Sequence, residues 1–311
     1  MSEYKKIALL GECMIELQDN DRDTVLRKFA GDTLNTSVYL SRLSDANSHE
    51  IAYVTALGVD RFSDQICDFC RSEGINTDLI QHSKTHLPGI YYVDLDDSGE
   101  RQFFYWRSQS AAKRILSSPG WENVLDQILE YDLLYFSGIS LAILEDEGRD
   151  RLIEFLPRYK EAGGKIVFDN NYRPKLWIDR EQAQHFYDLC LRQTDLALLT
   201  AEDDLALWQD EDLESLIKRN RQYGIGELVI KRGADPCLIV QGESRKEVAA
   251  ELVENVVDTN AAGDSFSAGY LSGWINGLDP EECARQGHYT ASQVIQHKGA
   301  IIPREINLKI S

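Results

Sequence analysis

The stretch Asp258-Thr259-Asn260-Ala261-Ala262-Gly263-Asp264-Ser265-Phe266 runs into an apolar helical pattern that continues to residue 274. The small side chains in its middle let the backbone approach a ligand closely, and the N–H groups of a helix start point outward, which favours anion binding. Asp264 lies inside this turn, where its carboxylate could accept the proton of a hydroxyl that attacks a bound phosphoryl group. The alternative is an ordinary helix start in which Asp264 is a favourable first-turn acid.

Short apolar runs alternate with helical patterns before this stretch. Such alternation predicts right-handed crossovers and a mostly parallel sheet that helices cover on both faces. The sequence is therefore predicted to adopt an α/β fold. The expected strands are residues 6–11, 51–56, 133–137, 165–169, 195–199 and 227–231, and the expected helices include residues 34–43, 62–73 and 266–274.

Two regions break the alternation. Residues 89–107 predict two strands around Asp97-Ser98-Gly99, which is a hairpin turn signal, and residues 14–27 are also strand-like. Because these strands follow the first strand and the second strand–helix unit, they are expected to meet over one edge of the main sheet as a small β lid, at about residues 12–29 and 88–108. The chain has no long Pro/Gly/Ser linker, so residues 1–311 are predicted to form a single domain with an inserted lid.

Composition narrows the class of protein. The 311 residues carry a net charge of −19 and contain no Lys/Arg-rich run, which argues against a nucleic-acid partner. No apolar stretch reaches the length of about 18 residues that a membrane helix needs, so no membrane association is expected. The six cysteines are scattered, which is typical of free thiols in a reducing compartment. We therefore expect a cytoplasmic protein.

Some familiar motifs are missing. The sequence has no G-x-x-x-x-G-K-[ST] loop and no G-x-G-x-x-G after the first strand, which argues against a P-loop kinase and a dinucleotide dehydrogenase. The pair Cys67-x-x-Cys70 lies in a helical pattern without a second pair, so coincidental packing is a better explanation than a zinc or redox site.

The stretch at 258–266 resembles the C-terminal signature of the ribokinase-like (PfkB) carbohydrate kinases, D-T-x-G-A-G-D-[ST]-F, with Ala261 in place of the first glycine. The N-terminal signature of that family is matched by Ala30-Gly31-Asp32-Thr33-Leu34-Asn35. The resemblance extends from Ile7 to Pro303. It implies the ribokinase-like fold, with a mostly parallel central sheet between helical layers, and transfer of the γ-phosphoryl of ATP to a sugar. Asp264 would be the catalytic base, and Ala261, Ala262 and Gly263 would form the anion hole.

Within the family, several segments resemble the members that phosphorylate 2-keto-3-deoxygluconate at its terminal hydroxyl. A sugar acid carries a carboxylate, for which arginine is the best bidentate partner. Arg107 ends the expected lid hairpin and Arg173 follows an expected strand, at the edge where ligands bind open α/β sheets. These segments are Gly11–Leu17, Gly31–Thr36, Phe104–Arg107, Asp169–Pro174, Lys231–Asp235 and Gly299–Arg304.

The resemblance also implies two sets of binding residues. The sugar acid is expected at Gly31, Asp32, Asn35, Tyr91, Tyr105, Arg107, Arg173 and Asp264. ATP is expected at Asn171, Arg173, Lys231, Gly233, Ala234, Asp235, Ala261, Ala262, Gly263 and His288.

Mg²⁺ is expected together with ATP. The family's metal-organising N-x-x-E segment is replaced here by Thr200-Ala201-Glu202-Asp203, so direct metal ligands are not assigned. Some members of the family use a monovalent cation near the anion hole, for which Asp258 is a candidate ligand. Because exposed strand edges invite pairing, a homo-oligomer joined through the lids is expected. The alternatives are a kinase of fructose or ribose on the same fold, or a catalytically silent protein that binds a sugar acid.

Overall fold

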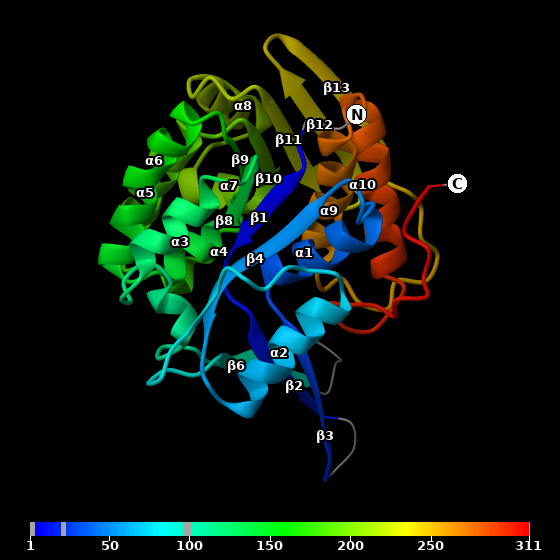
Figure 1. The fold of residues 1–311 in the computed structure, drawn as a ribbon. Helices are drawn as coiled ribbons and strands as arrows, with labels where there is room; N and C mark the ends of the chain where they lie inside the picture. The colour runs from blue at the N-terminus through cyan, green and yellow to red at the C-terminus, as the bar shows by residue number, and fades with distance from the viewer. Residues whose placement is uncertain (1–3, 20–22, 96–100, 311) are drawn as a thin grey trace.

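The computed structural model describes residues 4–19, 23–95 and 101–310. The hairpin turn predicted at Asp97-Ser98-Gly99 lies outside the described residues. A nine-stranded sheet crosses the molecule in the order β13-β12-β11-β10-β9-β8-β1-β4-β5 (Figure 1). Its strands are β1 (Lys6–Leu10), β4 (Glu50–Leu57), β5 (Ile80–His82), β8 (Leu133–Ser137), β9 (Lys165–Asp169), β10 (Leu196–Thr200), β11 (Glu227–Arg232), β12 (Asp235–Gln241) and β13 (Ser244–Val248).

In this sheet order, the strands from β11 through β1 to β5 pair in parallel, which confirms the mostly parallel sheet. Each predicted strand is present, with its ends within one residue of the prediction. The sequence analysis did not predict β12 and β13, which continue the sheet antiparallel to β11 as a hairpin. Four residues of β13 are exposed, and its charged sequence Ser244-Arg245-Lys246-Glu247 lacks the apolar run by which the other strands were recognised.

Helices cover both faces of this sheet. The helices α1 (Asp32–Leu43), α2 (Arg61–Ser72), α9 (Ala262–Ile275) and α10 (Pro280–Val294) contribute to the apolar core on one face. The opposite face packs against α3 (Trp121–Ile128), α4 (Gly138–Ile143), α5 (Asp146–Glu161), α6 (Arg180–Leu191), α7 (Ala201–Trp208), α8 (Leu213–Arg221) and the short 3₁₀ turns η1 (Ala111–Arg114) and η2 (Pro174–Leu176).

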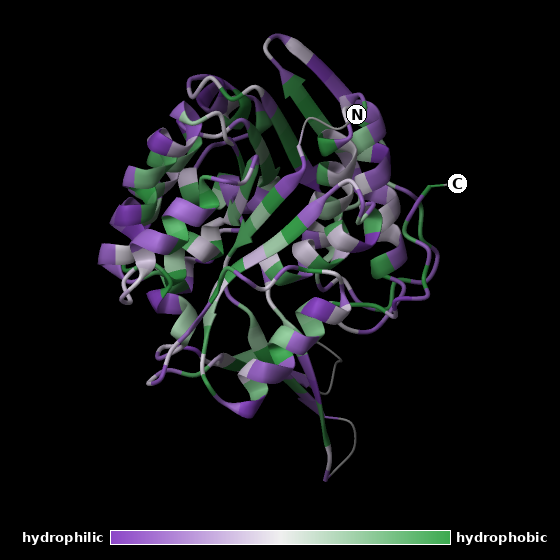
Figure 2. Cartoon of the chain, in the orientation of Figure 1, coloured by the Kyte–Doolittle hydropathy of each residue, from purple (hydrophilic) through white to green (hydrophobic). Residues whose placement is uncertain are grey.

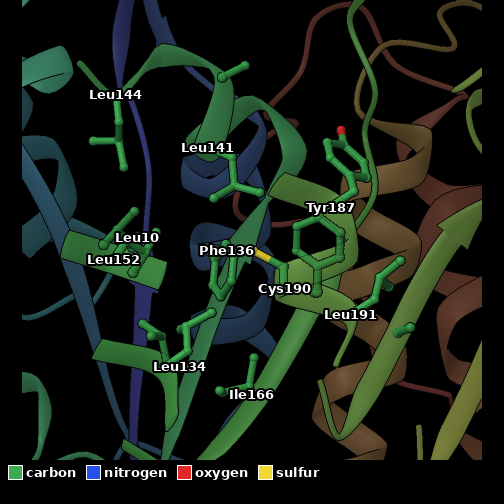
Figure 3. Packing of buried hydrophobic residues seen from close by; sticks show 14 of the residues in the cluster. Leu10, Leu134, Phe136, Leu141, Leu144, Leu152, Ile166, Tyr187, Cys190 and Leu191 are labelled. Atoms are coloured by element: carbon green, nitrogen blue, oxygen red, sulfur yellow. The ribbon is translucent and has the colours of Figure 1, made fainter. Parts of the chain in front are cut away.

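The strands bury both faces because successive side chains point to opposite sides of a strand. In β1, Ile7 and Leu9 pack on the α1 side, whereas Ala8 and Leu10 pack on the α5 side. Figure 2 shows the consequence: the central strands are largely hydrophobic and the outer surfaces of the helices are hydrophilic. Figure 3 shows how residues of β8 and α6, among them Phe136 and Cys190, pack together on the α5 side.

A second, four-stranded sheet has the order β3-β2-β6-β7. It is built from β2 (Met14–Asp19), β3 (Val25–Ala30), β6 (Gly89–Leu95) and β7 (Arg101–Trp106), and it lies beyond one end of the main sheet (Figure 1). β2 and β6 are parallel, and each has an antiparallel partner at the outside. The small inserted sheet predicted from the sequence is therefore confirmed, and the region 14–27 proves to hold parts of two antiparallel strands.

Candidate active site

The helix α9 begins where the sequence placed an anion-binding turn. Ala261 adopts a left-handed backbone conformation with φ 59° and precedes the first helical residue, Ala262. The turn opens toward solvent, since Gly263 is exposed and Asp264 is half-buried in the first helical turn. A helix N-terminus and a carboxylate that can take a proton therefore lie side by side. The N–H of Ala262 donates to the carbonyl oxygen of Thr259 over 3.2 Å in this structure.

The two signature segments meet at this turn. Asn35 of α1 donates from Nδ2 to Oδ2 of Asp264 over 2.8 Å, and Thr36 donates to the main-chain oxygen of Asp264 over 3.3 Å. Gly31, which caps α1, lies against the main chain of Glu12, and a Cβ there would overlap the Glu12 carbonyl oxygen. Glycine at this position therefore allows α1 to start close to the end of β1 and to bring Asn35 to the base.

The pKa of Asp264 is raised to about 7, mainly by loss of hydration and then by the neighbouring carboxylates of Asp32 and Asp169, whereas the hydrogen bond from Asn35 and the charge of Lys231 act in the opposite direction. A general base works best when its pKa is close to the working pH. The environment of Asp264 therefore suits proton abstraction near neutrality.

Asp32 faces the ends of two neighbouring strands. Its Oδ2 accepts hydrogen bonds from Ser137 Oγ, at 2.5 Å, and from Asn171 Nδ2, at 3.0 Å. Burial raises the pKa of Asp32, and the guanidinium of Arg107 acts in the opposite direction. The charge of Arg107 on the lid thus lowers the pKa of Asp32, and the charge of Asp32 raises the pKa of Asp264 in the turn of α9.

Two buried residues under the turn were not predicted as a pair. Lys231, at the end of β11, donates to Asp169 Oδ2 at 2.7 Å, and Ser267 of α9 donates to the same oxygen at 2.8 Å. The sequence analysis assigned Lys231 to ATP and gave Asp169 no role. The position of Asp169, at the C-terminal end of a buried strand, is the signal that could have identified it.

Arg173 lies at the same edge and is half exposed. Its Nη1 contacts both carboxylate oxygens of Asp203, at 3.2 and 3.1 Å. The hairpin of β11 and β12 lies two strands away from β9 in the sheet order. Three exposed residues predicted to bind ATP lie at this hairpin: Gly233, which adopts φ +62°, Ala234, and Asp235 at the start of β12. A nucleotide has access to this turn.

The inner face of the lid is aromatic and charged. The rings of Tyr91 and Tyr105 lie 5.8 Å apart, and the guanidinium of Arg107 lies 5.7 Å from the centre of the Tyr105 ring. Arg107 forms an ion pair with Glu12, a fully buried residue at the end of β1 that the sequence analysis did not assign to the site. Glu16 accepts a hydrogen bond from Tyr91. Three of the predicted substrate residues are thus brought together by the lid.

His288 lies apart from the exposed turns. Its ring is buried, its Nε2 lies 3.0 Å from the carbonyl oxygen of Val248, and it packs edge-on against Phe266. Burial lowers its pKa. In this conformation the ring joins α10 to the end of β13, so its contact with a nucleotide base stays a prediction.

Three further findings bear on the predictions. Among the described residues, no group of three or more His, Cys, Asp or Glu side chains is arranged to hold a metal ion. Within residues 4–19, 23–95 and 101–310, no helix has the length and apolar character needed to cross a membrane. Cys67 and Cys70 are buried free thiols of α2, in agreement with a packing role.

Residues 4–307 match the pfkB family carbohydrate kinases. The chain belongs to this family. It is 49% identical, over 97% of its length and 98% of the relative's length, to the 2-dehydro-3-deoxygluconokinase of Escherichia coli strain K12. This pfkB kinase fold is shared with the crystal structure of the 2-dehydro-3-deoxygluconokinase of Thermotoga maritima, at a TM-score of 0.81, 21% identity and coverage of 97% and 95%. An E. coli protein crystallised with ATP and Mg²⁺ has a TM-score of 0.82 at 18% identity, with 95% and 94% of the two chains covered.

Membership of the pfkB family confirms the ribokinase-like fold and the assignment of the chain as a carbohydrate kinase. It also favours the interpretation of the stretch at 258–266 as a phosphoryl-transfer turn over that of an ordinary helix start. The individual roles of the site residues stay predictions, now supported by the geometry described above.

Proposed function

We propose that the protein transfers the γ-phosphoryl group of ATP to the terminal hydroxyl of 2-keto-3-deoxygluconate, giving 2-keto-3-deoxy-6-phosphogluconate. The observation that carries this proposal is the combination of Asp264 and Arg107 in one site. Asp264 supplies a base with a pKa of about 7 at the start of α9, and Arg107 supplies a guanidinium directly after the lid strand β7. A sugar acid has the two groups that this arrangement suits, a hydroxyl and a carboxylate. The high identity to a 2-dehydro-3-deoxygluconokinase supports the same substrate.

The reaction needs one proton acceptor and stabilisation of the transferred group. The substrate oxygen bonds to the γ-phosphorus, the bond from that phosphorus to the β–γ bridging oxygen breaks, and ADP leaves with the electron pair. Asp264 takes the hydroxyl proton, and the N–H groups of the turn at 261–264 stabilise negative charge on the phosphoryl oxygens. Positioning and charge stabilisation account for most of phosphoryl-transfer catalysis, and this turn supplies both.

ATP is proposed to bind along the C-terminal edge of the main sheet, between the turn of α9 and the turn at 233–235, with Asn171 and Arg173 beside it. Mg²⁺ would accompany the β- and γ-phosphates and neutralise their charge. Carboxylate oxygen is a ligand that Mg²⁺ accepts, and Asp203 presents one at this edge, although Arg173 contacts it in the structure.

The lid is proposed to close over the sugar acid. Arg107 would bind the carboxylate, with Tyr91 and Tyr105 beside it, and Gly31, Asp32 and Asn35 would position the hydroxyls. Closure would exclude water and so protect ATP from hydrolysis. In this proposal residues 1–311 act as one kinase domain with an inserted lid.

The test is ADP release from ATP and Mg²⁺ with 2-keto-3-deoxygluconate, beside fructose, ribose and gluconate. It uses the unmodified chain, Asp264→Asn, and the exposed-residue control Asp68→Asn. Rapid turnover of the keto acid, lost only in Asp264→Asn, supports the proposal. Turnover of a neutral sugar instead would overturn the assignment of the substrate and leave the base. Binding of the keto acid without ADP release from the unmodified chain would indicate a silent sugar-acid binder.

We also propose a homodimer, or a larger assembly built from it, that is joined through the lids. The outer face of β7 carries Phe104 and Trp106, whose side chains are 46% and 63% exposed. Large apolar side chains grouped on an exposed strand favour burial against a second copy. Light scattering should give a multiple of the 35.4 kDa chain mass, and Trp106→Glu should shift it toward the monomer. A monomeric parent protein would contradict this proposal.

A cytoplasmic location is also proposed, supported by the six buried free thiols.

A further inference from the structure

Glu12 lies in the short link between the main sheet and the lid, after β1 and before β2. The residue is buried, with 1% of its surface exposed. Ser110 donates a hydrogen bond from Oγ to Glu12 Oε1 over 2.5 Å, and Arg107 forms an ion pair with Glu12 Oε2. Because both partners follow the lid strand β7, this one carboxylate anchors the end of the lid hairpin next to the end of β1.

The contact with Glu12 uses only part of the Arg107 guanidinium. Among the described residues, the guanidinium contacts Glu12 through Nη2 and faces the ring of Tyr105, and the Arg107 side chain is 13% exposed. A guanidinium has five N–H donors in a planar fork, so donors remain for the carboxylate of a ligand. Gly89, the first residue of β6, makes room for the pair, since a Cβ there would be 3.0 Å from Glu12 Oε1 and 3.2 Å from Cβ of Arg107.

Carboxylates outnumber cations in this site. Glu12 and Asp32 both lie within the electrostatic reach of Arg107, and the charge of Asp32 raises the pKa of Glu12. A ligand carboxylate on Arg107 would be a third anion beside one guanidinium, under a lid that is proposed to close. Buried charge without a partner is costly, and uptake of a proton by one carboxylate removes that cost.

Glu12 is the carboxylate best placed to take up this proton. It contacts the same guanidinium as the ligand would, so the ligand carboxylate competes with it directly for the positive charge. Burial raises the pKa of Glu12 above its ordinary value, although Arg107 and Ser110 lower it. A further anion next to Arg107 would offset the effect of the guanidinium and favour the protonated form.

We propose that Glu12 couples binding of the sugar acid to the uptake of one proton. In the free protein, ionised Glu12 holds Arg107 in position. When the substrate carboxylate binds to Arg107, a carboxylate oxygen of Glu12 forms an O–H bond with a proton from solvent, and the charge of the guanidinium is left to the substrate, whose carboxylate stays ionised. Glu12 is a positioning residue, because it acts through Arg107. The inference rests on the proposed function, in which Arg107 binds the substrate carboxylate.

Other titratable groups around Glu12 have to be separated from it. The groups that face it are Arg107 and Ser110 after β7, Tyr105 of β7, Asp32 of α1 and the thiol of Cys13. Burial raises the pKa of Tyr105 and of Cys13, so both already carry their proton near neutral pH. Asp32 accepts two side-chain hydrogen bonds, which favour its ionised form. Asp264, with a pKa of about 7, is removed in the experiment.

The first experiment measures proton uptake by isothermal titration calorimetry of 2-keto-3-deoxygluconate, without ATP, in buffers of different ionisation enthalpy. It compares Asp264→Asn with Glu12→Gln/Asp264→Asn and Glu227→Gln/Asp264→Asn. Glu227 is the matched control, because it is a buried glutamate held by two neutral side chains, Tyr270 and Gln241. Over about pH 5.5–8, uptake should reach at least about half a proton in Asp264→Asn and in the control, and stay below about a tenth with Glu12→Gln. Equal uptake in the Glu12 variant, or none in Asp264→Asn, would overturn the inference.

The second experiment follows the affinity for the keto acid against pH in the same proteins. Uptake of a proton on binding makes the affinity fall as pH rises, by up to about tenfold per pH unit for one proton. With Glu12→Gln the slope should be close to zero, whereas Glu12→Asp keeps the charge and should retain the slope at a lower affinity. A purely structural role of Glu12 would lower the affinity in both variants and leave the slope unchanged, which would contradict the proposal.

Ser110→Ala tests the same coupling with Glu12 in place, and it serves if Glu12→Gln fails to fold. Ser110 lowers the pKa of Glu12, so its removal should move the fall in affinity to higher pH, and a fall that stays in place would contradict the inference. Binding without proton uptake, together with ADP release from the unmodified enzyme, would overturn this inference and leave the proposed function. Proton uptake without ADP release from the unmodified enzyme would do the reverse. Absence of binding of any sugar acid would contradict both.

Discussion

The C-terminal edge of the main sheet and the lid differ in how tightly their side chains are packed. At the edge, Asp169 and Lys231 are buried in a hydrogen-bonded network, and the helix starts of α1 and α9 fix Asn35 and Asp264 around it. On the lid, the strand β7 is exposed along most of its length, and its rings Phe103 and Tyr105 contact each other and Tyr91.

This difference fits the roles proposed for the two regions. A base needs a fixed position and a fixed electrostatic environment, which packed helices and strands supply. The lid is proposed to open and close, and low packing density lowers the free-energy cost of such a motion. We therefore expect changes at the sheet edge to lower kcat and changes at the lid to raise KM.

The largest effect is expected from Asp264→Asn. The amide keeps the size of the side chain but cannot accept the substrate proton, so kcat should fall by about 10²–10⁴-fold, the usual contribution of a positioned base. Steady-state ADP release gives kcat and KM. A variant whose kcat stayed within threefold of the parent value would show that another group is the base.

Asp264→Asn should be at least as stable as the parent protein, so its loss of kcat could not be attributed to unfolding. The pKa of Asp264 is raised to about 7 in the folded protein, so ionising it costs stability as pH rises from the unfolded value near 3.8 to about 7. Asparagine removes that penalty, which is fully present above pH 7 and absent well below pH 4. Thermal melts should show Asp264→Asn to be as stable as the parent at acidic pH and more stable at pH 8.

The next effect is expected at the lid. Arg107→Ala removes the guanidinium that is proposed to bind the substrate carboxylate, and a charge-assisted hydrogen bond of this kind is worth about 1.5–3 kcal/mol. KM for the keto acid should rise by roughly 10- to 150-fold, with a much smaller change in kcat. Arg107→Lys should recover only part of this loss, because a lysine cannot form the bidentate pair. An effect on kcat alone would place Arg107 with the sheet-edge residues instead.

A smaller effect is expected from the carboxylate between the two regions. Activity should require ionised Asp264, so kcat/KM should fall as pH drops through about 7. Asp32 raises the pKa of Asp264, and Asp32→Asn should therefore move this acid limb to lower pH. A pH–rate profile over pH 5–9 measures the shift. Movement in the opposite direction would mean that Asp32 acts on catalysis through substrate binding and not through the charge of its carboxylate.

The C-terminal edge of the main sheet could be located from the sequence, but the buried pairs of residues beneath the site could not. Buried strands and a helix start leave local patterns, so the strands β8 and β9 and the turn at 258–266 could be located from the sequence alone. The pairs beneath the site join residues far apart in the sequence. Lys231 is separated from Asp169 by 62 positions, and Glu12, between β1 and β2, pairs with Arg107, which follows β7. No local pattern specifies such a pair, because its geometry depends on how the whole sheet is assembled.

The resemblance to a family identified most of the site residues, but it did not predict their hydrogen-bond partners. Asn171 was expected to bind ATP, and the structure shows that its amide donates to Asp32. His288 was also expected to bind ATP, and its Nε2 lies beside the carbonyl oxygen of Val248. Partners of this kind depend on side-chain packing, which a motif does not describe.

The smallest effect concerns the backbone of the turn itself. Ala261 has φ 59°, which costs an L-residue about 1–2 kcal/mol, and the family signature has glycine at this position. Ala261→Gly should relieve this strain and lose part of the gain to the greater entropy of an unfolded glycine, leaving a net stabilisation of about 0.5–1 kcal/mol. The adjacent Ala262 is helical, so Ala262→Gly should destabilise the protein by a similar amount. Thermal melts of the two variants should therefore shift in opposite directions, by roughly 1–3 °C each. Equal shifts of both would show that packing and not backbone strain determines the stability of this turn, and would remove the reason to regard the sheet edge as a rigid support for the base.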